Sequence, residues 1–209
     1  MINDLKYRWF ELFSSFSDNE QFLEKHFDLL LNHYKHSSRY YHNEQHLQHM
    51  LLQSKSNSVC IDDRWLLDVA IFFHDVIYDV KKKDNELKSA IYASDFLSVL
   101  GIDSQYISEV KCLINSTSKH LVMCDNKEIN AWLLDIDLSI LGSDWESYHQ
   151  YMKDIRKEYA IYPTILYKKG RKKVLKRFLE RERIYFTDQF YVLSEIKARE
   201  NLTRELKML

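Results

Sequence analysis

The chain contains few residues that break helices. Its 209 residues include only three glycines and one proline, whereas β-sandwiches and barrels need turn residues every few positions. This scarcity excludes an all-β architecture and predicts an all-α protein made mainly of long helices. The length is sufficient for one domain that buries a substantial core without cross-links.

Cysteine is also scarce, with three residues, Cys60, Cys112 and Cys124. Their number is odd and their spacing contains no Cys-x-x-Cys motif. We therefore predict neither a disulfide framework nor a zinc site made of thiolates. A chain without disulfides is typical of a reducing compartment, so we predict a cytoplasmic location.

A strong net charge and long apolar runs are likewise missing. The formal net charge is −1 at pH 7, so the global charge predicts no nucleic-acid or membrane partner. The first ten residues carry Asp4, Lys6 and Arg8 within an apolar pattern, and no later apolar run is long enough to cross a bilayer. We expect neither export nor insertion, and a homo-oligomer stays open as an alternative to a monomer.

Capping signals mark the helices that the sequence predicts. Two segments read as capping boxes, residues 17–20 and 143–146, and each is followed by an apolar stripe at helical spacing. Single residues expected to cap a helix, at its start or at its end, are Asn43, Asp84, Gly101 and Asp103. The segment from Asp62 to His74 is apolar nearly all round, which predicts a central helix.

The chain has no linker-like composition, low-complexity tract or internal repeat. We therefore predict a single all-α domain over residues 1–209. Its core is expected at about 20–160, followed by a C-terminal helical extension over 161–209.

Four residues have the chemistry of a metal site: His42, His74, Asp75 and Asp137. His74 and Asp75 are adjacent, while His42 upstream and Asp137 downstream lie in separate apolar segments with helical patterns, so a helical fold can bring all four together. Imidazole binds Zn, Fe, Co, Ni and Mn, while carboxylates suit harder ions such as Mg and Mn. This mixture predicts a divalent metal with hydrolytic or redox chemistry rather than a closed structural zinc site.

In order and residue type, these four residues resemble the His…His-Asp…Asp signature of the HD superfamily of metal-dependent phosphohydrolases. The resemblance to a bacterial subfamily of predicted HD phosphohydrolases extends from about residue 36 over nearly all of the remaining chain. It includes residues 39–43, 73–79, 84–86, 89–90, 135–142, 155–159, 170–171 and 183–185. It implies an HD-type helical bundle in which one or two divalent ions (Mn, Mg, Fe, Co, Ni or Zn) hydrolyse a phosphoester of a small molecule, usually a nucleotide.

The resemblance also assigns the aspartates. In a regular helix Asp135 and Asp137 point about 200° apart, so only one of them can face a given site. Family patterns place the metal on the second, Asp137, which leaves Asp135 either as a partner of the ligands or as a surface cap.

Two further histidines are candidates for the site. His46 lies one turn beyond His42 and could face the same site. For His46 we favour a role in substrate binding or in supporting the ligands over direct ligation of the metal. His120 is the candidate ligand for a second metal, because related binuclear sites have extra histidines between the His-Asp pair and the last aspartate. Those sites usually have two, and His120 is the only histidine in that interval.

Catalytic and substrate-binding candidates complete the prediction. Asp75 is expected to share in catalysis, Glu86 is the leading acid/base candidate, and Asp79 follows it. For Glu86, charge complementation at a helix start is the simpler alternative. The resemblance singles out three residues for substrate binding: Arg156, Arg171 and Tyr185. Two other functional classes stay open, a non-catalytic nucleotide-binding regulatory module and a di-iron oxygenase on the same scaffold.

Overall fold

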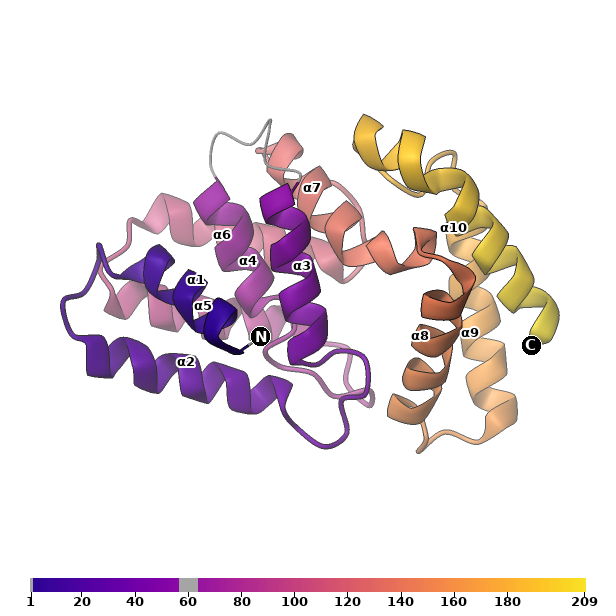
Figure 1. Cartoon of the computed structure of the whole chain (residues 1–209), viewed down its shortest axis with the longest axis horizontal. Coiled ribbons are helices and arrows are strands. Elements are labelled where there is room, and N and C mark those ends of the chain that lie inside the picture. The colour runs from indigo at the N-terminus through magenta and orange to yellow at the C-terminus, as the bar shows by residue number, and fades with distance from the viewer. Residues whose placement is uncertain (1, 57–63) are drawn as a thin grey trace. The chain divides into compact units, whose positions relative to one another are not determined.

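The computed structural model describes residues 2–56 and 64–209, and every regular element in them is a helix (Figure 1). The all-α prediction is therefore confirmed. The chain forms two compact units, residues 1–133 and 134–209. The prediction that the whole chain is one domain with a core at about 20–160 stays a prediction.

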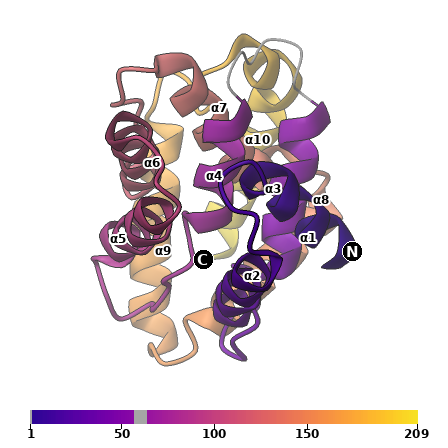
Figure 2. The same cartoon turned by 90° about the vertical axis from the view of Figure 1, so that its left-hand side faces the viewer.

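Within the described residues of the first unit, 2–56 and 64–133, lie six complete helices and the start of a seventh. Their bounds are α1 Ile2–Phe13, α2 Glu20–Tyr34, α3 Glu44–Ser56, α4 Arg64–Phe73, α5 Asn85–Val99, α6 Ser104–Thr117 and α7 Lys127–Asp137. Helix α4 contacts α3, α5 and α6, and α5 and α6 run side by side (Figure 2). Every residue of α4 from Leu66 to Phe73 is buried, so the predicted central helix is confirmed.

An aromatic cluster around Trp9 forms much of the first core. Trp9 is fully buried, and its indole N–H donates a 3.0 Å hydrogen bond to the Leu23 carbonyl. Five phenylalanine rings lie within 6 Å of it, centre to centre: Phe13, Phe27, Phe72, Phe73 and Phe96. Because aromatic pairs add packing energy to their large buried area, this cluster ties α1 to α2, α4 and α5.

The predicted caps are mostly in place. The side chains of Asn43 and Asp103 accept backbone N–H groups at the starts of α3 and α6, and Gly101 has a φ of 69° after the end of α5. The two capping-box predictions are wrong in detail, because Asn19 and Asp144 are the capping residues rather than Ser17 and Ser143. Asp84 precedes α5 but makes no side-chain cap and instead forms an ion pair with Lys88.

Beyond α7 the second unit contains a 3₁₀ helix, η2 Leu138–Gly142, and three α-helices, α8 Trp145–Glu158, α9 Thr164–Leu179 and α10 Asp188–Met208. Helix α10 packs against η2 and runs beside α9 (Figure 1). The approach to η2 is close, because a Cβ added at Gly142 would lie 2.6 Å from the Cβ of Ser194. Asn201 reinforces this contact by donating to the carbonyls of Leu141 and Ser143, each at 2.9 Å.

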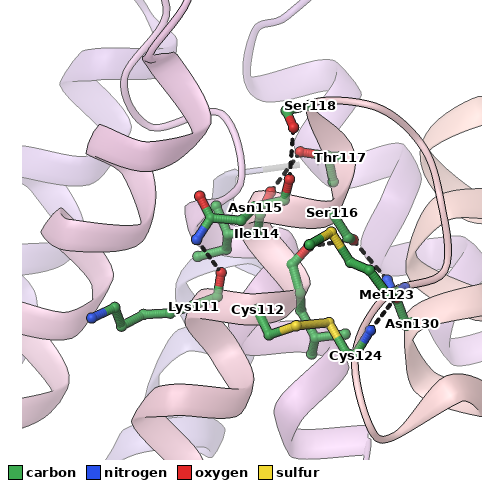
Figure 3. The surroundings of a disulfide bond; sticks show 11 residues. Lys111, Cys112, Ile114, Asn115, Ser116, Thr117, Ser118, Met123, Cys124 and Asn130 are labelled. Carbon is green, nitrogen blue, oxygen red and sulfur yellow. Dashed lines mark hydrogen bonds between the residues drawn. A yellow bond between two sulfur atoms is a disulfide. The ribbon is translucent and has the colours of Figure 1, made fainter.

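Cys112 on α6 and Cys124 in the connection to α7 form a disulfide, with their Cα atoms 5.8 Å apart (Figure 3). The prediction of a chain without disulfides is wrong for this pair. The physical reason is that residues twelve apart can meet when a helix is followed by a connection that returns along it, which no Cys-x-x-Cys spacing would reveal. Cys60 lies outside the described residues.

Among the described residues, no helix combines the length and the hydropathy that a membrane span requires.

Candidate metal centre

His46, His74 and Asp75 bring three potential ligand atoms within 4.8 Å of one another in the first unit. The Nε2 atoms of the two histidines are 3.4 Å apart, and His74 Nε2 lies 3.3 Å from Asp75 Oδ2. Both imidazoles are buried, at 5% and 1% exposure, and the Asp75 side chain is 14% exposed. Two imidazoles and a carboxylate in a mostly dry setting are a donor set for a divalent first-row metal.

The end of α4 sets the orientation of His74. The last carbonyls of a helix have no partner within it, and the Ile71 carbonyl lies 2.8 Å from His74 Nδ1. A carbonyl oxygen can only accept, so Nδ1 carries the hydrogen and neutral His74 has its lone pair on Nε2. A ligating histidine is commonly fixed in this way by a hydrogen bond from its other nitrogen.

The spacing of the two imidazoles fits a shared ion. Two nitrogens bound to one tetrahedral zinc at about 2.0–2.1 Å would be roughly 3.3–3.4 Å apart, and the two Nε2 atoms are 3.4 Å apart. The donor chemistry therefore fits a divalent metal held by His46, His74 and Asp75.

His42 lies beside this group without being a member of it. Its ring centre is 5.8 Å from that of His46 and 4.4 Å from that of Tyr78, to which it is tilted by 31°. Asn43 caps α3 immediately after it, and the first turn of that helix points His46 into the site. The structure thus groups His46 with the His-Asp pair, whereas the sequence favoured His42, whose ligation stays a prediction.

Arg39 joins the two segments that carry the site. Its Nη1 donates to the carbonyls of His42 and Asp75 at 3.2 and 2.6 Å, and its Nη2 donates to the carbonyl of Val76 at 2.9 Å. Arg39 is 7% exposed, and its guanidinium lies over the Tyr34 and Tyr78 rings. A single buried side chain therefore fixes the segment before α3 relative to the turn after α4.

The first turns of α5 hold the chain that follows Asp75. The Asn85 amide accepts from the backbone N–H of Asp79 at 3.1 Å and donates to the carbonyl of Asp79 at 3.0 Å. The Ser89 hydroxyl likewise bonds both backbone groups of Ile77. These contacts give the turn after the His-Asp pair a fixed path.

The two acid/base candidates occupy different environments in this segment. The Asp79 carboxylate accepts from the N–H of Lys81 at 2.9 Å and so stabilises its own turn. Glu86 is half-buried in the first turn of α5. Neither belongs to the metal-binding group, and their catalytic roles stay predictions.

His120 lies in the connection after α6 with a φ of 49°. Outside glycine, histidine is among the residues that adopt this left-handed conformation more readily than most. His120 is not part of the group formed by His46, His74 and Asp75, so its role toward a second metal stays a prediction.

The two aspartates of α7 belong to the second unit and have different surroundings. The buried Asp135 carboxylate accepts from the N–H groups of Phe186 and Thr187 and from the Thr187 hydroxyl, at 2.7–3.1 Å. Burial raises the pKa of Asp135 to about 6, although these hydrogen bonds act in the opposite direction. The buried Asp135 carboxylate thus holds the start of α10 in place. The alternative prediction, that Asp135 is a cap at the protein surface, is therefore wrong.

Asp137 is the last residue of α7 and is half-buried. Burial raises the pKa of the Tyr151 hydroxyl, and the charge of Asp137 adds to that rise. Asp135 and Asp137 therefore point to different neighbours, as the helical geometry predicts. Ligation by Asp137 stays a prediction.

The three residues that the resemblance singles out for substrate binding all have structural contacts in the second unit. Arg156 donates to the carbonyls of Tyr159 and Tyr162 beyond the end of α8. Tyr185 is fully buried, and its hydroxyl donates to the carbonyl of Leu138 at 3.1 Å.

Arg171 forms a two-pronged pair with Glu205, at 2.7 and 3.0 Å, and donates to the Tyr151 hydroxyl. The side chains of Arg171 and Glu205 are 9% and 1% exposed. These contacts give Arg156, Arg171 and Tyr185 structural roles in the second unit, and their binding of substrate stays a prediction.

Arg39 and Asn85 were not predicted as site residues. Both lie inside sequence stretches that carry the family resemblance, residues 39–43 and 84–86. The signal that could have found them is their position beside His42 and after the His-Asp pair. Their hydrogen bonds to distant backbone groups, however, leave no trace in residue spacing.

Comparison with known proteins gave no match to a family model, a curated protein or a solved structure.

Proposed function

We propose that this protein is a metal-dependent phosphohydrolase whose first unit holds a divalent ion between His46, His74 and Asp75. The observation that carries the proposal is the pair of buried imidazole Nε2 atoms, 3.4 Å apart, with a carboxylate oxygen 3.3 Å from one of them. Unless an ion or a shared hydrogen lies between them, two nitrogen lone pairs at this distance repel each other, and a divalent ion would remove that repulsion.

A divalent ion at this position would lower the pKa of a bound water and polarise a phosphoryl oxygen. The residues of the chain supply the rest. The Ile71 carbonyl keeps the His74 lone pair on Nε2, and Arg39 holds the backbone of His42 and Asp75. Asp75, whose side chain is 14% exposed, is proposed to face the incoming substrate.

The substrate class is supported by the sequence resemblance, which favours a phosphoester of a small molecule such as a nucleotide. Glu86 is the proposed proton-transfer residue, because it is half-buried and follows Asn85, which holds the turn after the His-Asp pair.

Elemental analysis of the purified protein, joined to a screen of nucleotides and other phosphoesters, tests the proposal. We expect about one or two divalent ions per chain and hydrolysis of at least one phosphoester. The variants His46→Ala, His74→Ala and Asp75→Ala should lose both metal and hydrolysis while keeping their helical circular dichroism.

His26→Ala is the matched control. His26 also places Nδ1 2.8 Å from a backbone carbonyl, that of Phe22, but it lies on α2 and outside the metal group. Full metal content in the His74→Ala and Asp75→Ala variants would exclude this centre. Bound metal without hydrolysis of any tested phosphoester would favour the regulatory module over the enzyme.

A further inference from the structure

The connection between α6 and α7 is fastened at two places. One is the Cys112–Cys124 disulfide, and the other is Asn130 on α7 (Figure 3). The Asn130 side chain accepts from the N–H groups of Met123 and Cys124, at 2.8 and 3.2 Å, and donates to the Ser116 hydroxyl at 2.7 Å. Because Asn130 is itself fully buried, the path of the connection does not depend on the disulfide alone.

Both cysteines line a groove of about 250 Å³ on the first unit. Leu113, Met123 and Ile129 form part of its apolar lining. Cys112 is partly exposed, whereas Cys124 is only 7% exposed. Of the two cysteines, Cys112 is therefore the more accessible to a small nucleophile in the groove.

The charge of the groove is of one sign. Among the described residues that line it, the charged ones are Glu109 and Asp125. Asp125 is exposed and directly follows Cys124. Two carboxylates beside the disulfide repel an anionic thiol and attract a cationic one, and salt screens this effect when the charges are exposed.

We propose that Cys112 and Cys124 form a thiol–disulfide exchange site that reacts, in the folded protein, with small neutral or cationic thiols. The thiolate of such a thiol attacks Cys112 Sγ, the disulfide bond breaks, and its electron pair leaves on Cys124 Sγ, which takes up a proton. A second thiolate attacks the sulfur of the bound thiol and releases Cys112. In sum, two small thiols are oxidised to one small disulfide, and the protein disulfide is reduced to two thiols. An excess of the small disulfide drives the reverse reaction, which reforms the protein disulfide.

The test follows the free thiols of the full chain, carrying Cys60→Ser so that only this pair reports. Cysteamine, 2-mercaptoethanol and 2-mercaptoethanesulfonate serve as cationic, neutral and anionic thiols, with rates expressed per thiolate. We expect cysteamine to react about tenfold faster than the sulfonate at low salt and the difference to shrink at high salt. Helical circular dichroism should stay constant throughout, and cystamine should restore the disulfide.

Two sets of variants test whether the reactivity comes from this groove or is common to any accessible disulfide. Glu109→Gln with Asp125→Asn should remove the preference for cysteamine without slowing 2-mercaptoethanol. In Cys124→Ser, the partly exposed Cys112 should form a stable mixed disulfide with cystamine. In Cys112→Ser, the buried Cys124 should react about tenfold more slowly.

Three results would overturn the proposal. The first is a reduced protein in which cystamine never forms the Cys112–Cys124 bond. The second is a disulfide that thiols reduce only as helical structure is lost, which would make it purely structural. The third is an equal rate for all three thiols at low salt, which would remove the charge selectivity.

Discussion

His74 and Ile71 are joined by a hydrogen bond of 2.8 Å between the imidazole Nδ1 and a carbonyl at the end of α4. The bond has two consequences. It gives the Ile71 carbonyl, near the end of the helix, a side-chain donor, and it turns the other nitrogen of the ring toward His46 and Asp75.

His74→Asn separates these two consequences. The asparagine amide can replace Nδ1 as donor to Ile71 but has no atom at the position of Nε2. We expect the variant to lose its metal completely while its free energy of unfolding stays closer to that of the wild type than in His74→Ala. Urea unfolding and elemental analysis measure both properties, and metal retained in His74→Asn would contradict the role of Nε2.

Arg39 should control both stability and metal affinity. Arg39→Ala leaves the carbonyls of His42, Asp75 and Val76 without their charged donor, at a cost of about 3 kcal/mol in the free energy of unfolding. Metal affinity should fall by about 10- to 100-fold, as for other residues that position ligands. Arg39→Lys keeps the charge but not the forked geometry, so an unchanged affinity in both variants would exclude the positioning role.

Glu86→Gln should lower the rate of hydrolysis by about 10²- to 10⁴-fold with metal content unchanged, as expected for a proton-transfer residue. The matched control is Asp84→Asn, which removes a half-exposed carboxylate at the same helix start, where Asp84 pairs with Lys88. Equal rates for the wild type and Glu86→Gln on the best substrate would exclude proton transfer by Glu86. Charge complementation at the helix start would then be its remaining role.

Asp137→Asn should weaken metal binding much more than Asp135→Asn. The prediction follows from the sequence assignment of Asp137 and from the contacts that fully engage Asp135 at Phe186 and Thr187. Isothermal titration with a divalent metal compares the two variants. The reverse order would transfer the ligand role to Asp135, and no effect from either would exclude both aspartates as ligands.

Asp135 should also make stability depend on pH. Its pKa is about 6 in the folded protein and 3.8 in the unfolded chain, so between these values the folded state binds more protons. Stability from this group is therefore fully present below about pH 4 and is lost as the pH rises through about 6. Asp135→Asn removes this dependence, so the stability difference between wild type and variant should be greater at pH 4.5 than at pH 7.5 in urea titrations. A difference that does not change with pH would contradict the raised pKa.

The sequence predicted the fold well where the signals are local. Helix capping involves only two or three residues of backbone, and the predicted capping roles of Asn43, Gly101 and Asp103 are confirmed. The capping boxes misplaced the cap by one or two residues, because serine and its neighbours Asn19 and Asp144 are all good caps and local propensity cannot rank them.

The site was harder to predict because its decisive contacts are distant in sequence. His42 and His46 are one turn apart, and only the start of α3 at Glu44 decides which ring is directed toward His74. Arg39 reaches Asp75 across 36 positions. The disulfide was missed for the same reason, since it depends on how the chain returns along α6.

The burial of Trp9 has a consequence for how the protein is made. Its ring in α1 packs against Phe72, Phe73 and Phe96, and Phe96 follows Trp9 by 87 positions in the sequence. At about 5–20 residues per second, a ribosome needs roughly 4–17 s to add that stretch. During this interval the apolar side of α1 has no native partners from α4 and α5, so a chaperone that binds emerging chains would find a target in α1.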